Sequence, residues 1–322
     1  MRSFEHINAR TVKEACVLLR RHEGKAVLNA GGTDLLSILK SENLPEYPEI
    51  LINIKTVRNL GCIAALRGGV RIGALTKLSD IVASPLIRER YPVLAQAAKS
   101  VATTQIRNAG TIGGNLCQHV RCAYYRYSRH IGGPIACARK GKGACPAVTG
   151  DNRYHAITQA KKCFAVCPSD TAVALAALDA RIVIAGSNGK RKASIVDFYQ
   201  PMRLNLAQDE MITHVEIPRL NEKTKQRFIK FTLSKPGDFA IVSVASVIAE
   251  TDGLCKDARI ALGAVAPGPL RVTKTEEMIA GKSIDEKIAA KAAELALSGL
   301  KPLSKNAYKV EIAKTLLKRA IL

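Results

Sequence analysis

The order of apolar and polar residues predicts alternating helices and strands in the first part of the chain. Thr11 and Glu14 form a T-x-x-E capping pair ahead of VKEACVLLRRH, whose apolar residues recur with helical spacing. An apolar strand from Ala26 to Asn29 follows, and a helix is expected from Leu35 to Lys40. A buried strand from Ile50 to Ile54 completes this first set of βα units.

The middle of the chain predicts a second region of strands and helices. A strand over Val70 to Leu75 precedes helical stretches from Thr76 to about Ala102. After a long segment without a regular period, Thr171 to Leu178 has helical composition. Arg181 to Ala185 and Met211 to Ile217 have the composition of strands.

The last part of the chain predicts strands followed by helices. The expected strands are Phe228 to Leu233, Ala240 to Ala249 and Ala258 to Val265, and the expected helices are Asp285 to Leu297 and Asn306 to Ile321. Such an order indicates an α+β domain with helices on one face of its sheet. The sequence contains no internal repeat.

Length and composition indicate a folded protein of two or three domains. The 322 residues are 47% hydrophobic and 24% charged, which excludes disorder, collagen-like repeats and a coiled-coil rod. The N-terminus lacks the apolar core of a secretory signal, and the richest apolar segment, residues 172–186, is interrupted by Asp179 and Arg181. We therefore expect a cytoplasmic protein that does not enter a membrane, with reduced thiols.

The strong positive charge allows three interpretations. Lys and Arg number 49 against 27 Asp and Glu, a formal net charge of +22. A nucleic-acid partner is one interpretation, but the basic residues are dispersed, aromatic residues make up only 4% and Trp is absent. A solvated basic surface is favoured, and a docking surface for acidic proteins is the third interpretation.

Six of the nine cysteines lie in an irregular segment rich in Gly, Arg and Lys: Cys117, Cys122, Cys137, Cys145, Cys163 and Cys167. Metal ligation would supply the stabilisation that so long a loop needs. Buried structural thiols are the alternative. It is disfavoured because the neighbouring residues are basic and should lower the thiol pKa, namely Arg121, Arg126, Arg139, Lys140 and Lys142.

The spacing of these cysteines favours an iron–sulfur cluster only slightly over zinc. Structural zinc sites usually have paired C-x2-4-C knuckles, which the long gaps from Cys122 to Cys137, Cys145 and Cys163 do not resemble. An iron–sulfur cluster accepts thiolates from irregular spacing. Six candidates for four positions leave the ligand set open.

Two glycine segments could together bind a diphosphate. Gly31 and Gly32 follow an apolar strand and precede a helix, and the loop Thr111 to Asn115 has the same chemistry. Paired glycines let backbone N–H groups approach phosphate closely. Neither G-x-G-x-x-G nor G-x-x-x-x-G-K-[ST] occurs, so a Rossmann site and a P-loop are disfavoured. For each segment alone an ordinary tight turn is the favoured interpretation, and the pair is a stronger indication than either segment.

These motifs resemble a known family. AGGTDLL at 30–36, IRNAGTIGGNL at 106–116 and SDTAVALAALDA at 169–180 resemble the FAD-binding medium subunit of the xanthine dehydrogenase and molybdenum hydroxylase family over the whole chain. The resemblance implies an α+β fold of the PCMH type, with two FAD-binding subdomains at 1–57 and 58–218. A C-terminal domain at 223–322, opened by KPGDFAIVSVA, would resemble that of the carbon monoxide dehydrogenase flavoprotein, a three-stranded sheet with helices.

The cysteine segment is an insertion, at 118–163, that most members of the family lack. RCAYYRYSRH, ACARKGKGACPA and GDNRYHAI resemble the insertion of the 4-hydroxybenzoyl-CoA reductase β subunit and of bacterial aldehyde oxidoreductase flavoprotein subunits, which binds a [4Fe-4S] cluster. The reductases would have their fourth Cys near Tyr154, so the aldehyde oxidoreductase pattern fits better. Cys167 is the reserve ligand and Cys117 a packed thiol. The implied ligands are Cys122, Cys137, Cys145 and Cys163.

The resemblance also implies a set of FAD contacts. Two segments would hold the diphosphate, Val101 would lie beside the flavin, and Asp170 would bind the adenosine ribose. Alternatively, Asp170 caps the helix from Thr171 and Lys230 is a solvated strand residue. The implied contacts are Asn29, Ala30, Gly31, Gly32, Thr33, Asp34, Leu35, Val101, Thr111, Ile112, Gly113, Gly114, Asn115, Asp170, Ile212 and Lys230.

The resemblance implies an electron-transfer subunit without catalytic residues of its own. A molybdopterin-binding large subunit would carry the substrate chemistry, and a small subunit would carry two [2Fe-2S] clusters. FAD and the [4Fe-4S] cluster would pass electrons to an external acceptor or from a donor, such as an acidic ferredoxin-like protein. Two alternatives are a zinc-stabilised nucleic-acid-binding protein and a cofactor-free scaffold subunit.

Overall fold

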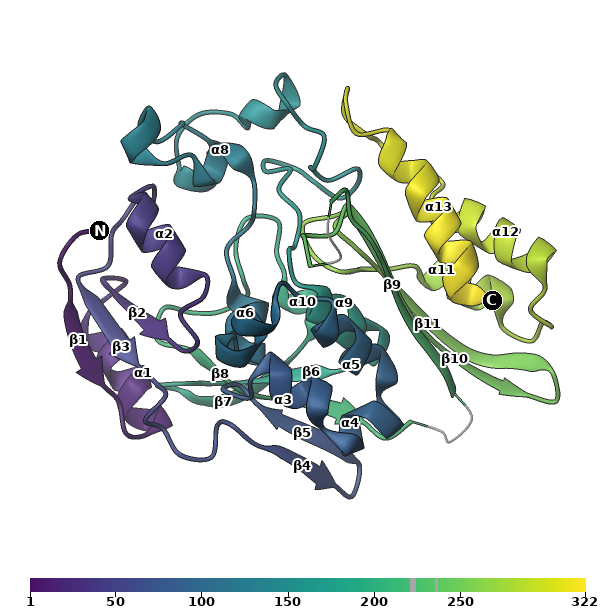
Figure 1. The fold of residues 1–322 in the computed structure, drawn as a ribbon, viewed down its shortest axis with the longest axis horizontal. Coiled ribbons are helices and arrows are strands. Elements are labelled where there is room, and N and C mark those ends of the chain that lie inside the picture. The colour runs from purple at the N-terminus through teal and green to yellow at the C-terminus, as the bar shows by residue number, and fades with distance from the viewer. Residues whose placement is uncertain (221–223, 235–236) are drawn as a thin grey trace.

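The computed structural model describes residues 1–220, 224–234 and 237–322. Figure 1 shows two sheet-based N-terminal parts packed against a C-terminal sheet whose outer face carries helices. The first part is a parallel sheet in the order β1-β3-β2. Its elements are β1 (Glu5–Asn8), α1 (Val12–Arg21), β2 (Ala26–Asn29), α2 (Leu35–Ser41) and β3 (Ile50–Asn53).

Helix α1 begins where the capping pair predicts. The Thr11 hydroxyl accepts the Glu14 N–H at 3.0 Å. The Glu14 carboxylate, however, accepts the N–H of Arg10 at 2.7 Å rather than that of Thr11. Ala15, Cys16 and Leu19 on one face of the helix are buried in the core of this part.

The second part is an antiparallel sheet in the order β4-β5-β8-β6-β7. Its strands are β4 (Ile63–Leu66), β5 (Gly69–Gly73), β6 (Arg181–Gly186), β7 (Gly189–Ser194) and β8 (Met211–Pro218). Short helices cover it and share one apolar core with it: α3 (Leu78–Ala83), α4 (Pro85–Arg90), α5 (Pro92–Lys99), α6 (Thr104–Ala109), α7 (Ile112–Cys117), α9 (Asp170–Ala177) and α10 (Ile195–Phe198).

The predicted loop at 111–115 is wrong, because this segment is the first turn of α7. The Thr111 hydroxyl accepts the N–H of Gly114 at 3.2 Å and so caps the helix. Gly113 donates its N–H to the Ala74 carbonyl, and Ile112 is fully buried. The bond to Ala74 and packing against α9 and β8 therefore compensate the poor helix propensity of the two glycines.

The C-terminal domain is an antiparallel sheet in the order β12-β11-β10-β9. The sheet contains the three predicted strands and a further two-residue strand, β12. Residues 235–236, which open KPGDFAIVSVA, lie outside the described residues. Helices α12 and α13 cover one face, while α5 and α9 of the second part contact the other. The elements are β9 (Thr224–Phe231), β10 (Val242–Thr251), β11 (Leu254–Gly263), β12 (Leu270–Arg271), α11 (Thr273–Ile279), α12 (Glu286–Ala296) and α13 (Tyr308–Ile321).

The cysteine-rich segment is irregular, as its sequence predicts. It contains α8 (Ala123–Arg126) and three 3-10 turns, η1 (Arg129–Ile131), η2 (Ala138–Lys140) and η3 (Pro146–Val148). Figure 1 shows it crossing the molecule from the side of α2 toward α13.

The segment returns to the body of the protein against the chain that leads into α13. Asn152 accepts the N–H of Lys305 at 2.8 Å, and Asn306 donates to the carbonyl of His155 at 3.1 Å. The Lys301 N–H reaches the Ile157 carbonyl at 3.0 Å. We call these contacts between residues 151–157 and 301–309 the clasp.

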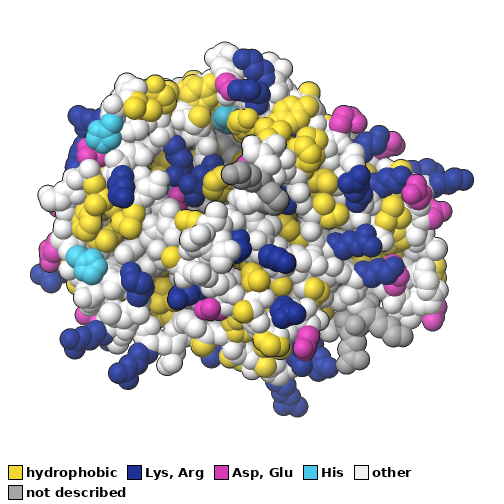
Figure 2. Space-filling model, viewed as in Figure 1, with side chains coloured by type: hydrophobic (Ala, Val, Ile, Leu, Met, Phe, Trp, Pro, Cys, Tyr) yellow, Lys and Arg dark blue, Asp and Glu magenta, His cyan; other side chains and the backbone are white. Residues whose placement is uncertain are grey.

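Basic side chains are dispersed over the face of the molecule shown in Figure 2. Many are paired with acidic residues, as in the contacts of Arg191 with Glu210 and of Arg271 with Glu276. This distribution is that of a solvated basic surface. Across the described ranges, no helix is long and apolar enough to cross a membrane.

Candidate functional site

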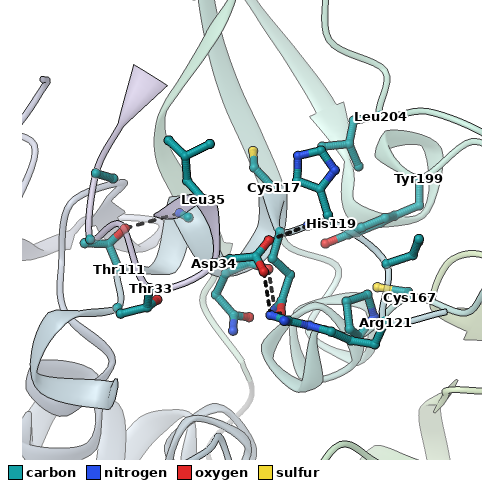
Figure 3. A pocket seen from close by; sticks show the side chains of 18 of the residues that line it. Thr33, Asp34, Leu35, Thr111, Cys117, His119, Arg121, Cys167, Tyr199 and Leu204 are labelled. Atoms are coloured by element: carbon teal, nitrogen blue, oxygen red, sulfur yellow. Dashed lines mark hydrogen bonds and ion pairs between the residues drawn. The ribbon is translucent and has the colours of Figure 1, made fainter. Parts of the chain in front are cut away.

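A cavity of about 800 Å³ opens between the first two parts of the chain and the C-terminal domain. Figure 3 shows its interior, with Thr33, Asp34 and Leu35 on one side and Tyr199 and Cys167 on another. Such a volume suits a large organic ligand. The cavity therefore has the size expected of a cofactor site.

The two glycine segments meet at this cavity. A Cβ atom added at Gly31 would lie 2.2 Å from the backbone oxygen of Ala109, so only glycine allows the two segments to approach this closely. Gly32 adopts a φ of +70°, which disfavours side chains. A Cβ at Gly110 would lie 3.5 Å from the Thr33 hydroxyl. The segments predicted to bind one diphosphate thus form one continuous wall.

Most of the predicted FAD contacts line the cavity. These are Ala30, Gly31, Gly32, Thr33, Asp34, Leu35, Val101, Thr111, Gly114, Asn115, Asp170 and Lys230. Four of the predicted residues do not line it: Asn29, Ile112, Gly113 and Ile212. Ile112 and Ile212 belong to the apolar core, and Gly113 packs on Ala74. These three support the wall from behind.

Asp34 joins the first glycine segment to the cysteine-rich segment. Its carboxylate lies 2.8 Å from Arg121 and 2.6 Å from Arg126, and it accepts the His119 N–H at 2.8 Å. Figure 3 shows Asp34 between His119 and Arg121. Burial opposes ionisation of Asp34, but the two guanidinium groups outweigh it and hold its pKa below the usual range.

The same wall contains a buried aromatic group. His119 lies 3.0 Å from the Tyr125 hydroxyl, and the two rings stack with centroids 5.9 Å apart. Burial lowers the pKa of His119 to about 4, so the ring is neutral at pH 7. On the opposite side, the Arg121 guanidinium covers the ring of Phe239 at 4.5 Å, which brings the C-terminal domain to the rim of the cavity.

Asp170 and Lys230 form a buried ion pair across the cavity floor. The Lys230 ammonium lies 2.8 Å from Asp170 and 2.9 Å from the Ser100 carbonyl, and Ser100 donates to Asp170 at 3.3 Å. Burial raises the pKa of Asp170, and Lys230 opposes that rise. Two alternatives are therefore wrong: Lys230 is not solvated, and the cap of α9 is Ser169, which accepts the Ala172 N–H.

Buried donors and acceptors without a protein partner also mark this site. Among the described residues, Asn29 Oδ1, Arg121 Nε and Arg139 Nε are buried and make no hydrogen bond. Arg121 and Arg139 line the cavity, and Asn29 Oδ1 lies behind Gly32. Because an unmade buried hydrogen bond is costly, the two arginine nitrogens indicate a polar ligand in the cavity.

Cys117 and Cys167 are packed thiols at the cavity, as predicted for Cys117. Burial raises the pKa of each to about 12. Tyr199 lies between them and donates its hydroxyl to the Leu116 carbonyl at 2.8 Å.

The remaining cysteines of the segment gather on the far side of Arg121. Cys137 and Cys163 are buried in one apolar cluster with Cys122 at its edge, and Cys145 and Cys163 lie close enough to Cys122 to act on its charge. His155 Nε2 lies 3.3 Å from the Cys122 sulfur. The structure therefore brings the four predicted ligands to one region next to the cavity wall.

The prediction that basic neighbours lower the thiol pKa is wrong for Cys122. Burial raises its pKa to about 11, and this outweighs the N–H groups of Tyr124 and Tyr125 that point to its sulfur. In the described part of the chain, no three His, Cys, Asp or Glu side chains converge closely enough to hold one metal ion.

Several cavity residues were not predicted from the sequence. They are Cys167 and Tyr199 on one side and His119, Arg121, Tyr125, Arg139 and Phe239 on the other. His119 to Tyr125 were assigned to the cysteine insertion alone, although RCAYYRYSRH begins only six positions after Asn115. That proximity in sequence was the available indication that the insertion also forms the cavity wall.

Comparisons with known proteins agree with this geometry. The FAD binding domain in molybdopterin dehydrogenase matches residues 2–220, and the CO dehydrogenase flavoprotein C-terminal domain matches residues 228–322. The aldehyde oxidoreductase FAD-binding subunit PaoB of Escherichia coli (strain K12) is 32% identical over 98% of this chain and 96% of PaoB. The carbon monoxide dehydrogenase medium chain of Hydrogenophaga pseudoflava is 28% identical over 99% of this chain and 96% of that one.

Solved structures show the same fold along the whole chain. Carbon monoxide dehydrogenase from Hydrogenophaga pseudoflava, in a form lacking the Mo-pyranopterin moiety, superimposes with a TM-score of 0.80 at 27% identity, over 99% of this chain and 96% of that one. Quinoline 2-oxidoreductase from Pseudomonas putida 86 gives a TM-score of 0.77 at 26% identity, with 99% and 96% coverage.

The α+β fold, the cavity lined by two glycine segments and the family match together define a flavoprotein subunit of the molybdenum hydroxylase type. The chain belongs to the xanthine dehydrogenase/CO dehydrogenase family, in which it is an FAD-binding medium subunit and a component of an oxidoreductase. The sequence-based family assignment and the α+β fold are confirmed.

Proposed function

We propose that this chain carries FAD in the cavity and transfers electrons between a molybdenum-containing partner and an external acceptor or donor. The meeting of the two glycine segments at the cavity is the observation that carries this proposal. Backbone N–H groups next to Gly32 would face the diphosphate, as they do at other phosphate-binding turns, and Gly114 would form the wall opposite them. Arg121 would supply a buried positive charge and an unused N–H donor.

The cavity offers a dinucleotide both apolar and polar walls. Val101 and the aliphatic residues around it provide an apolar wall for the flavin ring, and Asp170 with Lys230 offers a polar site for the ribose. When bound, FAD exchanges single electrons with iron–sulfur centres and pairs of electrons with an organic or protein partner. The protein residues hold it in place and exclude water.

We further propose that the cysteine-rich segment holds a [4Fe-4S] cluster bound by Cys122, Cys137, Cys145 and Cys163. Their gathering beside one apolar cluster supports this assignment. A single zinc ion needs its sulfurs at about 2.3 Å from the metal, whereas a cluster of several irons spaces its thiolates more widely. The long, irregular gaps between these cysteines are also unlike the paired knuckles of structural zinc sites, which favours a cluster.

The location of the cysteines supports an electron path between the two centres. Arg121 pairs with Asp34 in the flavin wall and is directly followed by Cys122. One rigid stretch of chain would thus contact both cofactors. A large subunit with molybdopterin and a small subunit with [2Fe-2S] clusters would complete the complex, and an acidic ferredoxin-like protein would dock on the basic surface.

Analysis of the purified complex tests the proposal. We expect one flavin and four irons for each copy of this chain beyond those of its partners, with a cubane signal in electron paramagnetic resonance (EPR) after reduction. Cys122→Ser should lose that signal and keep FAD. Cys62→Ser is the matched control, because Cys62 is exposed and far from the insertion in sequence. Zinc in place of iron would contradict the cluster, and an absent flavin band would contradict the FAD site.

A further inference from the structure

A histidine in the cysteine-rich segment points at the sulfur of Cys122. His155 Nε2 lies 3.3 Å from Cys122 Sγ, and the residue is only 4% exposed. The other ring nitrogen, Nδ1, is buried and has no hydrogen-bond partner among the described residues. Toward a thiolate, which accepts but cannot donate, Nε2 can only act as the donor. With Cys122 bound to a metal centre as a thiolate, this geometry would give its sulfur an N–H from a side chain.

The clasp fixes the position of this imidazole. The His155 carbonyl accepts the Asn306 side-chain amide at 3.1 Å and the Lys309 ammonium at 3.0 Å. Lys309 is fully buried, and Asn306 also holds the next carbonyl, that of Ala156, at 3.2 Å. Tyr124 packs against the ring with centroids 6.1 Å apart. The ring is thus held from the C-terminal domain on one side and from α8 on the other.

The Cys122 sulfur already faces two backbone donors. The N–H groups of Tyr124 and Tyr125, in the first turn of α8, point to it. His155 adds a third donor from a segment 33 residues away. Hydrogen bonds to a ligating sulfur draw negative charge from it, so they stabilise the reduced, more negative state of a cluster. The side-chain donor is the one that a substitution can remove.

We propose that His155 is a positioning residue that donates a hydrogen bond through Nε2 to the Cys122 thiolate and raises the reduction potential of the metal centre there. This role rests on the proposed function, in which Cys122 binds a [4Fe-4S] cluster. The clasp serves the same role, because it sets the distance between ring and sulfur. Electrons on the flavin would then be drawn more strongly toward the cysteine-rich segment.

Potentiometric titration of the cluster, followed by EPR on the intact complex, tests the role of His155. His155→Phe should leave iron and flavin contents unchanged and shift the cluster potential to more negative values. His214→Phe is the matched control, because His214 lies in β8 and contacts Glu216 instead. An intact cluster with an unchanged potential in His155→Phe would overturn the role of His155 alone, whereas an iron-free wild type would overturn the cluster proposal itself.

A pair of amide variants keeps the test decisive if the Phe variant does not fold. A Gln side chain carries its amide nitrogen near the position of Nε2, and an Asn side chain does not reach it. We expect His155→Gln to keep a potential near that of the wild type, and His155→Asn to show the negative shift. Loss of one iron with a three-iron EPR signal in both variants would contradict the donor role, because it would make His155 a ligand.

Discussion

The Lys230 ammonium and the Asp170 carboxylate lie 2.8 Å apart at the floor of the cavity, and both side chains are more than nine-tenths buried. Lys230 comes from β9 of the C-terminal domain, and Asp170 from the start of α9. The pair therefore joins two domains at the proposed cofactor site. Removing one charge of such a pair leaves the other buried without compensation.

This pair predicts a specific pattern of stabilities. Lys230→Met should lower the free energy of unfolding by about 3 kcal/mol, and adding Asp170→Asn should restore part of the loss. Urea denaturation measures both changes. Lys225→Met, on the same strand but exposed and paired with Glu250, should cost less than about 1 kcal/mol. If Asp170 also binds the ribose, the double variant should still bind FAD more weakly, and an unchanged flavin content would contradict that contact.

The approach of the two glycine segments predicts a strong effect at Gly31. Gly31→Ala places a Cβ atom against the Ala109 carbonyl, so the segments must separate. We expect at least tenfold weaker FAD binding, measured as flavin absorbance per chain after dialysis. Gly68→Ala is the control, because nothing lies within 4 Å of its Cβ position. Equal flavin retention in the two variants would show that the close approach does not matter.

The lowered pKa of Asp34 predicts sensitivity to acid. A carboxyl group whose folded pKa is depressed contributes stability above its unfolded pKa of about 3.9, and this stability is lost as pH falls through the folded value. Asp34→Asn should therefore lower the free energy of unfolding by about 3 kcal/mol at pH 7. The melting temperature of the variant should also fall less steeply than that of the wild type between pH 7 and pH 3. An equal fall in melting temperature for variant and wild type would contradict the pairing with Arg121 and Arg126.

Lys309 predicts a dependence of stability on alkaline pH. Burial lowers its pKa to about 7, from an ordinary value of 10.5. The unfolded chain therefore binds more protons between these values, and stability should rise with pH across that range by a few kcal/mol. Lys309→Met should remove this rise, measured by urea denaturation at pH 7 and pH 9.5. Lys314→Met, which removes an exposed lysine of the same helix, should keep it.

Local sequence patterns predicted the regular elements that have an apolar face of their own. Helix α1 and strands β2, β3 and β8 follow their predictions closely. Strands β4 and β7, with sequences IAAL and GKRKAS, were missed because neither alternates apolar and polar residues. Helix α7 was missed because two glycines disfavour a helix whose stability depends on the Thr111 cap and on packing against α9 and β8.

The candidate site was predicted where one short motif contains the chemistry and was missed where it depends on tertiary contacts. The glycine segments were found because each follows a recognisable pattern, and both line the cavity. The contact of Asp34 with Arg126 joins residues 92 positions apart, and that of Lys230 with Asp170 spans 60 positions. No local pattern specifies such pairs. That these residues bind FAD stays a prediction.

The clasp has a consequence for the order in which the protein is made. Residues 151–157 leave the ribosome long before residues 301–309, to which they bind across about 150 positions. The insertion cannot take up its final arrangement while the chain is still being synthesised. Under the proposed function, the cluster would therefore be inserted only into the completed polypeptide, and a chain that ends before Asn306 would lack the clasp.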